Sequence, residues 1–346
     1  METYIYILIL LGIFSFFRKN KVVICLSFLL LLIVGGLRDF SVGTDTLNYL
    51  NLYEYGDNTS FMKGFEWGYT LIQQFVYFYV GDYTFLVFTQ MLLILLFFYI
   101  FILRESDNPL FSVFCFVGLY YWLYSLNTTR QYLAIPLVLI GFSHLNRDKV
   151  KPFIGFVLMA MLFHTSAFFA LIVLVFRKDI FSFLLGKGVL VLSFVIGLTP
   201  LIPVLLSVFV SVFDMLGLTG FSMYLSDTSD YRIEGFSVSR FLLTIYGCLI
   251  LLLLDNKLLY VRIFIFGIIL LNLFAFQPDV ARLAQYFVCI QIVLIPNIPI
   301  YIRNEKNIFP LQLVSLVYMV ITFLYLLNAN VGEVVPYKFN QNIQIW

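Results

Sequence analysis

The sequence predicts an all-α protein, a polytopic transmembrane helical bundle. Of its 346 residues, 62% are hydrophobic and only 12% are charged, which is about half the charged fraction of an ordinary soluble domain. The mean hydropathy is +0.98, and 40 Phe and 23 Tyr supply aromatic side chains that suit lipid tails and headgroup belts. Because one bundle can use the whole chain, we expect residues 1–346 to form a single integral membrane domain.

Apolar runs between polar segments locate the helices. A straight helix needs about 20 apolar residues to cross the hydrocarbon core, and the chain contains about eleven to thirteen candidate membrane segments, some short or re-entrant. The clear candidates are residues 22–37, 84–103, 110–126, 153–176, 238–254, 258–276, 283–302 and 308–327. The shorter or broken candidates are residues 4–17, 69–80, 131–143, 180–198 and 200–217.

Basic clusters predict the orientation of these helices, because Lys and Arg are enriched in cytoplasmic loops. Three clusters stand between apolar runs, and they lie at residues 18–21, 147–151 and 303–306. The loops at residues 38–68 and 218–240 and the tail 328–346 then face outward.

Three segments need a separate interpretation. No basic residue precedes the first apolar run, 4–17, so it is expected to be a helix with an outer N-terminus rather than a cleavable signal. Residues 69–80 are best interpreted as a half-helix or interfacial helix, because a full crossing would move Arg104 to the other side. Residues 153–176 either span once or re-enter; we favour the single span, which places Arg177 outside.

Polar residues next to apolar helices are the first candidates for a site, because a charge inside the bilayer is costly and usually faces a cavity. Arg130 directly precedes an apolar helix and is followed by Gln131, and His164 lies near the middle of the run 153–176. A snorkelling arginine and a structural histidine are the alternatives. The functional interpretation is anion binding by Arg130 and proton transfer or substrate contact by His164.

Outward arginines suggest a distributed anion site, because guanidinium groups bind phosphate bidentately and stay charged when desolvated. A diphosphate at the membrane surface is the natural anion for such a set. Arg282 has an alternative, an ion pair with Asp279 three residues earlier. The arginines in question are Arg38, Arg130, Arg232, Arg240 and Arg282.

The polar loop that follows the second apolar run supplies candidate carboxylates. Gly43, Thr44 and Asp45 are typical of a tight turn and a helix cap. The alternative is that Asp45 acts as a general base on a sugar hydroxyl, a role for which Asp39 and Glu66 compete.

Other function classes lack their signatures. The chain has two His and four Cys, and none of them shows the spacing of a metal site or a CxxC pair. Phosphate-binding and dinucleotide motifs are missing, so we expect no cofactor. The basic residues are too scattered for a nucleic-acid surface.

Several motifs, in their order along the chain, resemble the EpsG family of polysaccharide polymerases, which is related to the Wzy polymerases. The resemblance spans most of the chain, but residues 180–240 show no motif that we can place. The matching motifs are "GLRDFSVGTDTLNY" (36–49), "FEWGYTLI" (65–72), "LNTTRQYLA" (126–134), "LFHTSA" (162–167), "RLAQYF" (282–287) and, more weakly, "VPYKF" (335–339).

The resemblance implies a GT-C-like, metal-independent glycosyltransferase of the bacterial cytoplasmic (inner) membrane. Such an enzyme takes oligosaccharide repeat units linked to undecaprenyl diphosphate and acts at the outer, periplasmic face. It moves the growing glycan from its lipid diphosphate onto the next lipid-linked unit, and the product is an O-antigen, a capsule or an exopolysaccharide. Besides this substrate, the expected partners are the lipid bilayer, a chain-length regulator and a flippase.

This chemistry assigns roles to the candidate residues. Arginines would stabilise the leaving diphosphate, and a base would deprotonate the attacking hydroxyl. Outward aromatic residues such as Tyr49, Trp67 and Tyr69 would stack on sugars or lie in the headgroup belt. The predicted catalytic residues are Asp45, Arg130 and His164, and the predicted substrate contacts are Arg38, Asp39, Thr44, Glu66, Gln131, Arg232, Arg240, Arg282 and Tyr286.

Three other functions remain open, and one of them, a membrane scaffold without chemistry, would leave the outward arginines and His164 unexplained. An O-antigen ligase would share the helices and the arginines, but such enzymes usually carry a larger late outer loop than residues 218–240. A flippase or transporter for the same lipid-linked units needs a polar path through the whole membrane, whereas most charges here gather at one face.

Overall fold

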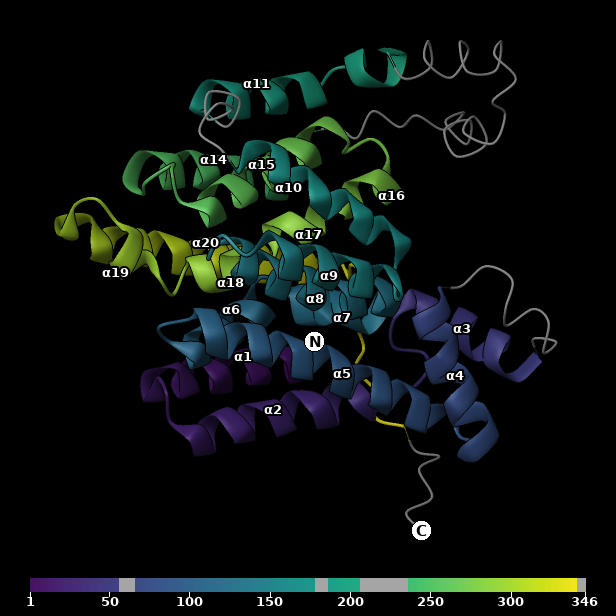
Figure 1. Ribbon diagram of the computed structural model, residues 1–346. Helices are drawn as coiled ribbons and strands as arrows, with labels where there is room; N and C mark the ends of the chain where they lie inside the picture. Colours follow the sequence, from purple (N-terminus) through teal and green to yellow (C-terminus); the bar gives the residue numbers. More distant parts are fainter. Residues whose placement is uncertain (56–65, 178–185, 206–235, 341–346) are drawn as a thin grey trace, which may run out of the picture. The chain divides into compact units, whose positions relative to one another are not determined.

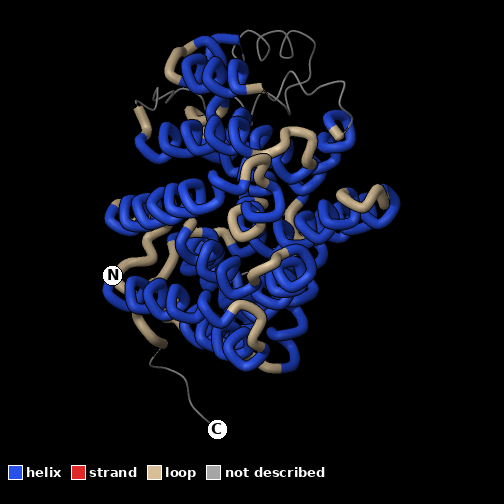
Figure 2. Tube along the Cα trace, turned by 90° about the vertical axis from the view of Figure 1, so that its left-hand side faces the viewer, coloured by secondary structure: helices blue, strands red, loops and turns tan. Residues whose placement is uncertain are grey.

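The structure is a computed structural model that describes residues 1–55, 66–177, 186–205 and 236–340. The described residues form helices joined by loops and turns, as Figure 2 shows. An isolated antiparallel bridge pairs Arg38 with Phe339. The predicted all-α fold class is confirmed. The chain divides into two compact units, which we describe separately: unit 1 is Met1–Leu171 with Cys289–Trp346, and unit 2 is Ile172–Val288.

Unit 1 begins with helices of which the second and the fifth have side-chain caps at their N-termini. Helix α1 (Glu2–Phe14) is followed by α2 (Lys21–Gly36), where Asn20 Oδ1 accepts hydrogen bonds from Val22 N and Val23 N. Helix α5 (Tyr83–Glu105) is capped in the same way by Asp82. The Ser27 and Tyr99 hydroxyls, 2.8 Å apart, join α2 to α5.

The centre of unit 1 contains a bent helix and a buried one. Residues 110–126 were predicted as one helix but form α6 (Pro109–Gly118) and α7 (Tyr121–Asn127), which meet at 56°. Tyr120, at the bend, has a left-handed φ of 71°. Helix α8 (Thr129–Leu145) follows and is buried along most of its length.

The predicted helix 153–176 is not continuous. Helix α9 (Val150–Met161) ends before His164, and a 3₁₀ helix, η2 (Thr165–Ile172), and the short α10 (Val173–Phe176) come next. Residues from another part of the chain satisfy the backbone groups at this break: Gly68 N donates to Leu162 O, and Thr165 N donates to the Glu66 carboxylate. Backbone groups that a broken helix leaves open inside a membrane need partners of this kind.

The predicted helix 283–302 is also interrupted. In unit 1 it gives α18 (Gln291–Leu294) and α19 (Ile298–Tyr301). Pro296, between them, cannot donate a backbone hydrogen bond. A 3₁₀ turn, η6 (Glu305–Asn307), then leads into α20 (Ile308–Asn328).

Unit 2 is organised around three packed helices, α11 (Lys187–Gly197), α14 (Val238–Leu253) and α15 (Leu259–Leu273). A buried hydrogen-bond cluster of Ser193, Thr244 and Asn272 joins them. Its other described helices are α16 (Pro278–Ala281), η5 (Arg282–Ala284) and α17 (Gln285–Val288), besides α10.

Helix length and composition agree with a polytopic membrane protein. In the described part of the chain, α5 and the segment Glu305–Asn328 are long and apolar enough to cross a membrane, and the bent pair α6–α7 would be a third span. Eight further apolar helices have 10–17 residues. The number of crossings and the single integral domain stay predictions.

Helix α8 separates two polar ends of unit 1. It has 17 residues, which corresponds to a length of about 25 Å. Arg130 lies at its beginning, and Arg147 follows its end. The end near Arg147 we call the basic end, because it brings together two of the basic clusters identified in the sequence.

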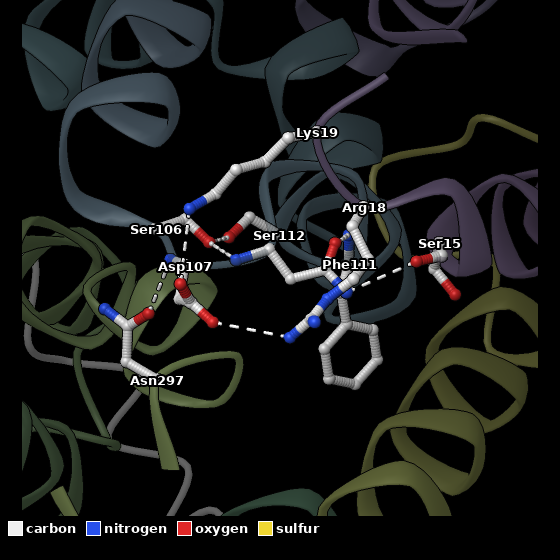
Figure 3. A network of polar contacts seen from close by, with 9 residues as sticks. Ser15, Arg18, Lys19, Ser106, Asp107, Phe111, Ser112 and Asn297 are labelled. Carbon is white, nitrogen blue, oxygen red and sulfur yellow. Dashed lines mark hydrogen bonds and ion pairs between the residues drawn. The ribbon is translucent and has the colours of Figure 1, made fainter. Parts of the chain in front are cut away.

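Figure 3 shows part of the basic end. Asp107, in the link between α5 and α6, accepts hydrogen bonds from Lys19 Nζ (3.3 Å) and Arg18 Nη2 (3.5 Å). Asn297 Oδ1 accepts from Asp107 N (2.8 Å), and Asn297 Nδ2 donates to Glu105 O (2.7 Å). The clusters at 18–21 and 147–151 therefore share one end, because Arg147 contacts the Glu105 carboxylate at 2.6 Å.

Candidate functional site

At the opposite end of unit 1, Glu66 joins Arg130 and His164. Its Oε2 lies 2.9 Å from Arg130 Nη1, and its Oε1 lies 3.1 Å from His164 Nδ1. Thr165 N also donates to Oε1, at 3.0 Å. The Glu66 side chain is 9% exposed, whereas Arg130 and His164 are 24% and 30% exposed. A largely buried carboxylate thus holds two partly exposed groups, and we call Glu66, Arg130 and His164 the triad.

Local chain geometry explains how these three residues meet. Glu66 directly precedes α4 (Trp67–Tyr79), Arg130 is the second residue of α8, and His164 stands in the break after α9. The start of α4 lies against that break, since Gly68 N donates to Leu162 O at 2.8 Å. A Cβ atom on Gly68 would lie 2.8 Å from the same oxygen, so only glycine allows this approach.

Two tyrosines hold the Arg130 guanidinium. Arg130 Nε donates to the Tyr49 hydroxyl at 3.3 Å, from α3 (Thr44–Tyr55). The guanidinium carbon lies 5.8 Å from the centre of the Tyr49 ring and 6.0 Å from that of Tyr69, within the range of cation–π attraction. Tyr69 is itself held by Gln90 Nε2, at 3.2 Å. Figure 1 shows α3 and α4 beside each other.

The surroundings of Glu66 keep it ionised. Burial alone would raise its pKa, but hydrogen bonds from His164 and from the Thr165 and Glu66 backbone, with the charge of Arg130, lower that pKa from 4.5 to about 2. A carboxylate with so low a pKa is a weak base at neutral pH. Glu66 is therefore better suited to orienting its neighbours than to accepting a proton.

His164 has the geometry of an oriented base. When Nδ1–H donates to Glu66, the lone pair of the neutral ring is on Nε2. Among the described residues, Nε2 has no hydrogen-bond partner. A carboxylate that fixes the imidazole tautomer in this way is the device by which histidine bases are oriented in hydrolases.

Arg38 was predicted to bind diphosphate, a role that stays a prediction, and in the structure it hydrogen-bonds to backbone carbonyls. Its side chain is 3% exposed. The guanidinium donates to three carbonyl oxygens, those of Gly35, Val42 (3.4 Å) and Leu126 (2.9 Å). Arg38 thus fastens the loop after α2 to the end of α7, and this burial leaves it little surface to offer an anion.

The other candidates in unit 1 lie near the start of α3. Asp39 Oδ1 accepts from Ser41 N and Ser41 Oγ, and the side-chain hydrogen bond is the main cause that lowers the Asp39 pKa. Thr44 is exposed, and its N–H donates to Gly332 O. Asp45 N donates to Asn127 Oδ1 at 2.8 Å. Their substrate roles, and that of the buried Gln131, stay predictions.

The remaining candidates belong to unit 2. Arg240, on α14, is 5% exposed, and Tyr286, on α17, is fully buried. Arg282, in η5, is exposed. Arg232 lies outside the described residues, as does most of the predicted outer loop 218–240. A shared anion site made by these residues and Arg130 stays a prediction.

Two contributions were missed or left ambiguous in the sequence. Tyr49 and Tyr69 had been considered only for sugar stacking or the headgroup belt, and their place beside Arg130 needs the tertiary fold. Asn127 was not a candidate, although it stands three residues before Arg130. Within the described residues, no group of three or more His, Cys, Asp and Glu side chains is arranged to hold a metal ion.

Comparison with known proteins agrees with the motifs. Neither the curated proteins nor the solved structures include a significant match to this chain. The EpsG family profile, in contrast, matches residues 21–339, a range that contains the triad. EpsG proteins are Wzy-like polysaccharide polymerases. With almost its whole length matched, the chain belongs to the EpsG family and is a membrane protein of surface polysaccharide synthesis.

Proposed function

We propose that this polymerase transfers a growing glycan from undecaprenyl diphosphate onto the next undecaprenyl-diphosphate-linked repeat unit, without a metal ion. The observation that carries the proposal is the triad, in which one buried carboxylate holds a base and a cation side by side. A glycosyl transfer from a diphosphate needs one of each. The base accepts the proton of the attacking hydroxyl, and the cation stabilises the departing diphosphate.

His164 is the proposed base. Its Nε2 takes the proton as the acceptor hydroxyl oxygen attacks the anomeric carbon of the donor glycan. The bond between that carbon and the diphosphate oxygen breaks, and its electron pair stays on the diphosphate. Glu66 stabilises the imidazolium that forms, across the 3.1 Å contact with Nδ1. The proton then passes to solvent or to the leaving group.

Arg130 is the proposed diphosphate contact. The guanidinium group has five N–H donors in a planar fork, so it can contact an anion in addition to Glu66 and Tyr49. Before the reaction the ionised Glu66, Arg130 and a neutral His164 carry no net charge. Proton transfer to His164 gives the triad a net positive charge as negative charge builds on the diphosphate. This change favours the transition state over the bound substrates.

The two ends of unit 1 support an outward-facing site. The basic end gathers the clusters at 18–21 and 147–151, which the positive-inside rule assigns to the cytoplasm. The triad lies at the other end of α8 and therefore faces the outside of the cytoplasmic membrane. A flippase would then deliver the lipid-linked units to this face, and a chain-length regulator would act on the product there.

A surface-glycan gel tests this function. A host that lacks the gene is complemented with the wild type or with Arg130→Ala, His164→Ala or Arg282→Ala. We expect the ladder to collapse to single repeat units without the gene, and only the wild type to restore it fully. Loss of the single-unit band as well would indicate a flippase or ligase. A ladder that persists without the gene would overturn the proposal.

A further inference from the structure

The C-terminal segment 330–340, which we call the strap, crosses the loop after α2. Asp39 N donates to Lys338 O (2.9 Å), and Asn340 N donates to Leu37 O (3.0 Å). This pairing is the isolated bridge seen between Arg38 and Phe339. The loop that leads into α3 is therefore bonded to the last described residues of the chain.

The strap has a defined shape of its own. Both amide atoms of Asn330 bond the backbone of Val335: Oδ1 accepts from its N–H at 2.8 Å, and Nδ2 donates to its carbonyl at 2.9 Å. Val334 is fully buried, and its carbonyl accepts from the Tyr4 hydroxyl at 2.9 Å. Asn330 thus closes a six-residue turn that fixes where the strap lies.

The strap and Asn127 together bond the N-terminus of α3. Gly43 N donates to Glu333 O (3.1 Å), and Thr44 N donates to Gly332 O (3.2 Å). Asp45 N donates to Asn127 Oδ1 (2.8 Å). These N–H groups at a helix start usually find a side-chain cap, water or an anion. Here the strap and Asn127 take that place, so α3 is held at its first turn by other parts of the chain.

The same helix carries Tyr49 to Arg130. Asn127 caps α3 from the end of α7, three residues before Arg130, and the Tyr49 hydroxyl accepts from Arg130 Nε one turn further along α3. Gly43 allows the start of α3 to approach the end of α7, because its φ is +98° and a Cβ there would lie 2.7 Å from Leu126 O. The position of α3 therefore decides where Tyr49 meets the guanidinium.

We propose that Asn127 and the strap are positioning elements for Arg130, acting through α3 and Tyr49. Their proposed effect is on the geometry of the triad. This inference rests on the proposed function of Arg130. It identifies the C-terminal segment, which follows the last long apolar helix, as part of the active-site support rather than as a loose tail.

The variant Asn330→Ala opens the strap turn while leaving every residue of the triad and of α3 unchanged. Its matched control is Asn297→Ala at the basic end. Asn297 also uses both amide atoms on the backbone, accepting from Asp107 N at 2.8 Å and donating to Glu105 O at 2.7 Å. The two substitutions thus remove the same kind of bonds at opposite ends of unit 1.

A thiol probe reports the position of α3 independently of activity. Thr46 is 3% exposed, so a cysteine introduced there by Thr46→Cys reacts slowly with a water-soluble maleimide while α3 stays docked. The measurement uses the full-length protein in lipid nanodiscs, with the parent protein as the blank for the native cysteines. Val42→Cys, at an equally buried site, replaces it if Thr46→Cys does not assemble.

Elongation of lipid-linked repeat units is measured on the same Asn330, Asn297 and Asn127 variants, prepared without the introduced cysteine. We expect Asn330→Ala to raise the labelling rate and to lower the turnover number by about tenfold or more, since a shift of about 1 Å in a catalytic group can cost about a hundredfold. Asn297→Ala should change neither the labelling rate nor the turnover number, even if it lowers the melting temperature as much as Asn330→Ala does. Asn127→Leu should lose turnover, and Asn127→Asp, which keeps the acceptor oxygen, should retain most of it.

Unchanged labelling in Asn330→Ala would overturn the inference, and so would faster labelling with wild-type turnover. Equal losses of turnover in Asn330→Ala and Asn297→Ala would also overturn it, because the effect would then be general destabilisation. A wild type that elongates nothing would refute the proposed function instead. In that case the labelling rates alone decide whether the strap holds α3.

Discussion

The two ends of unit 1 contain the same residue types in different arrangements. At the triad, a buried Glu66 meets Arg130 and His164; at the basic end, a buried Glu105 meets Arg147, at 2.6 Å. The chain has two histidines, one at each end. A Glu, an Arg and a His are thus present twice, about 25 Å apart along α8.

The two histidines differ in which ring nitrogen faces a charged side chain and in the sign of that charge. His164 presents Nδ1 to a carboxylate. His144 presents Nε2 to Arg104, at 3.1 Å. Arginine only donates, so the His144 Nε2 lone pair is already used. Its ring also stacks on Phe156, 5.3 Å away. The same residue types therefore do not suffice for a site. The ring nitrogen that faces a carboxylate decides whether the other nitrogen of the histidine can act as a base.

Replacing the two histidines gives the largest expected contrast. His164→Ala should reduce elongation by about a hundredfold to ten-thousandfold, the usual contribution of a general base. His144→Ala should leave elongation within about twofold, because that histidine has a structural contact only. Elongation by purified protein in nanodiscs provides the measurement. Equal losses in both variants would remove the distinction between the two ends.

The two arginines should separate in the same way, with a smaller effect. Arg130→Ala should lower the turnover number by about a hundredfold to a thousandfold, as for loss of one transition-state donor. Arg130→Lys should also be strongly impaired, because an ammonium lacks the planar fork. Arg147→Ala should lower the melting temperature with little change in turnover, since it leaves Glu105 without that cation. Full activity of Arg130→Lys would reduce the role of Arg130 to a simple charge.

Tyr49→Phe tests the contribution of one hydrogen bond to Arg130. The ring remains beside the guanidinium, but the 3.3 Å bond to Arg130 Nε is lost. We expect turnover to fall by about threefold to tenfold, which corresponds to about 1 kcal/mol for one hydrogen bond. Steady-state kinetics with varied donor checks this value. A loss as large as that of Arg130→Ala would mean that the Tyr49 hydroxyl itself contacts substrate.

The smallest effect concerns stability and pH. The folded protein lowers the Glu66 pKa from 4.5 to about 2, so the ionised Glu66 stabilises the folded state. This contribution is complete above pH of about 4.5 and is lost as the pH falls towards 2. Glu66→Gln should therefore flatten the decline of melting temperature across that range. An unchanged decline would assign the acid sensitivity to other carboxyl groups.

The fold class and the three members of the triad were within reach of sequence analysis. Apolar runs are a local signal, so they predicted α2, α5 and α20 to within about two residues. Arg130, His164 and Glu66 were noticeable because polar residues are rare beside such runs. The breaks at Tyr120 and His164 were not predicted, because both depend on backbone groups finding partners elsewhere in the fold.

The relation between the candidates was beyond the sequence. Glu66 is 64 residues from Arg130 and 98 from His164, and no local pattern indicates that they meet. The carbonyls around Arg38 belong partly to α7, so its structural task was hidden as well. The strap was visible only as the weak motif "VPYKF", with no indication that it crosses the loop before α3.

The most direct test of the account is an experimental structure of the protein in nanodiscs with a donor analogue and an acceptor bound. We expect the acceptor hydroxyl within hydrogen-bond distance of His164 Nε2 and the diphosphate on Arg130, with Glu66 still bridging the two residues. Substrate bound elsewhere, with the triad far from the diphosphate, would contradict it.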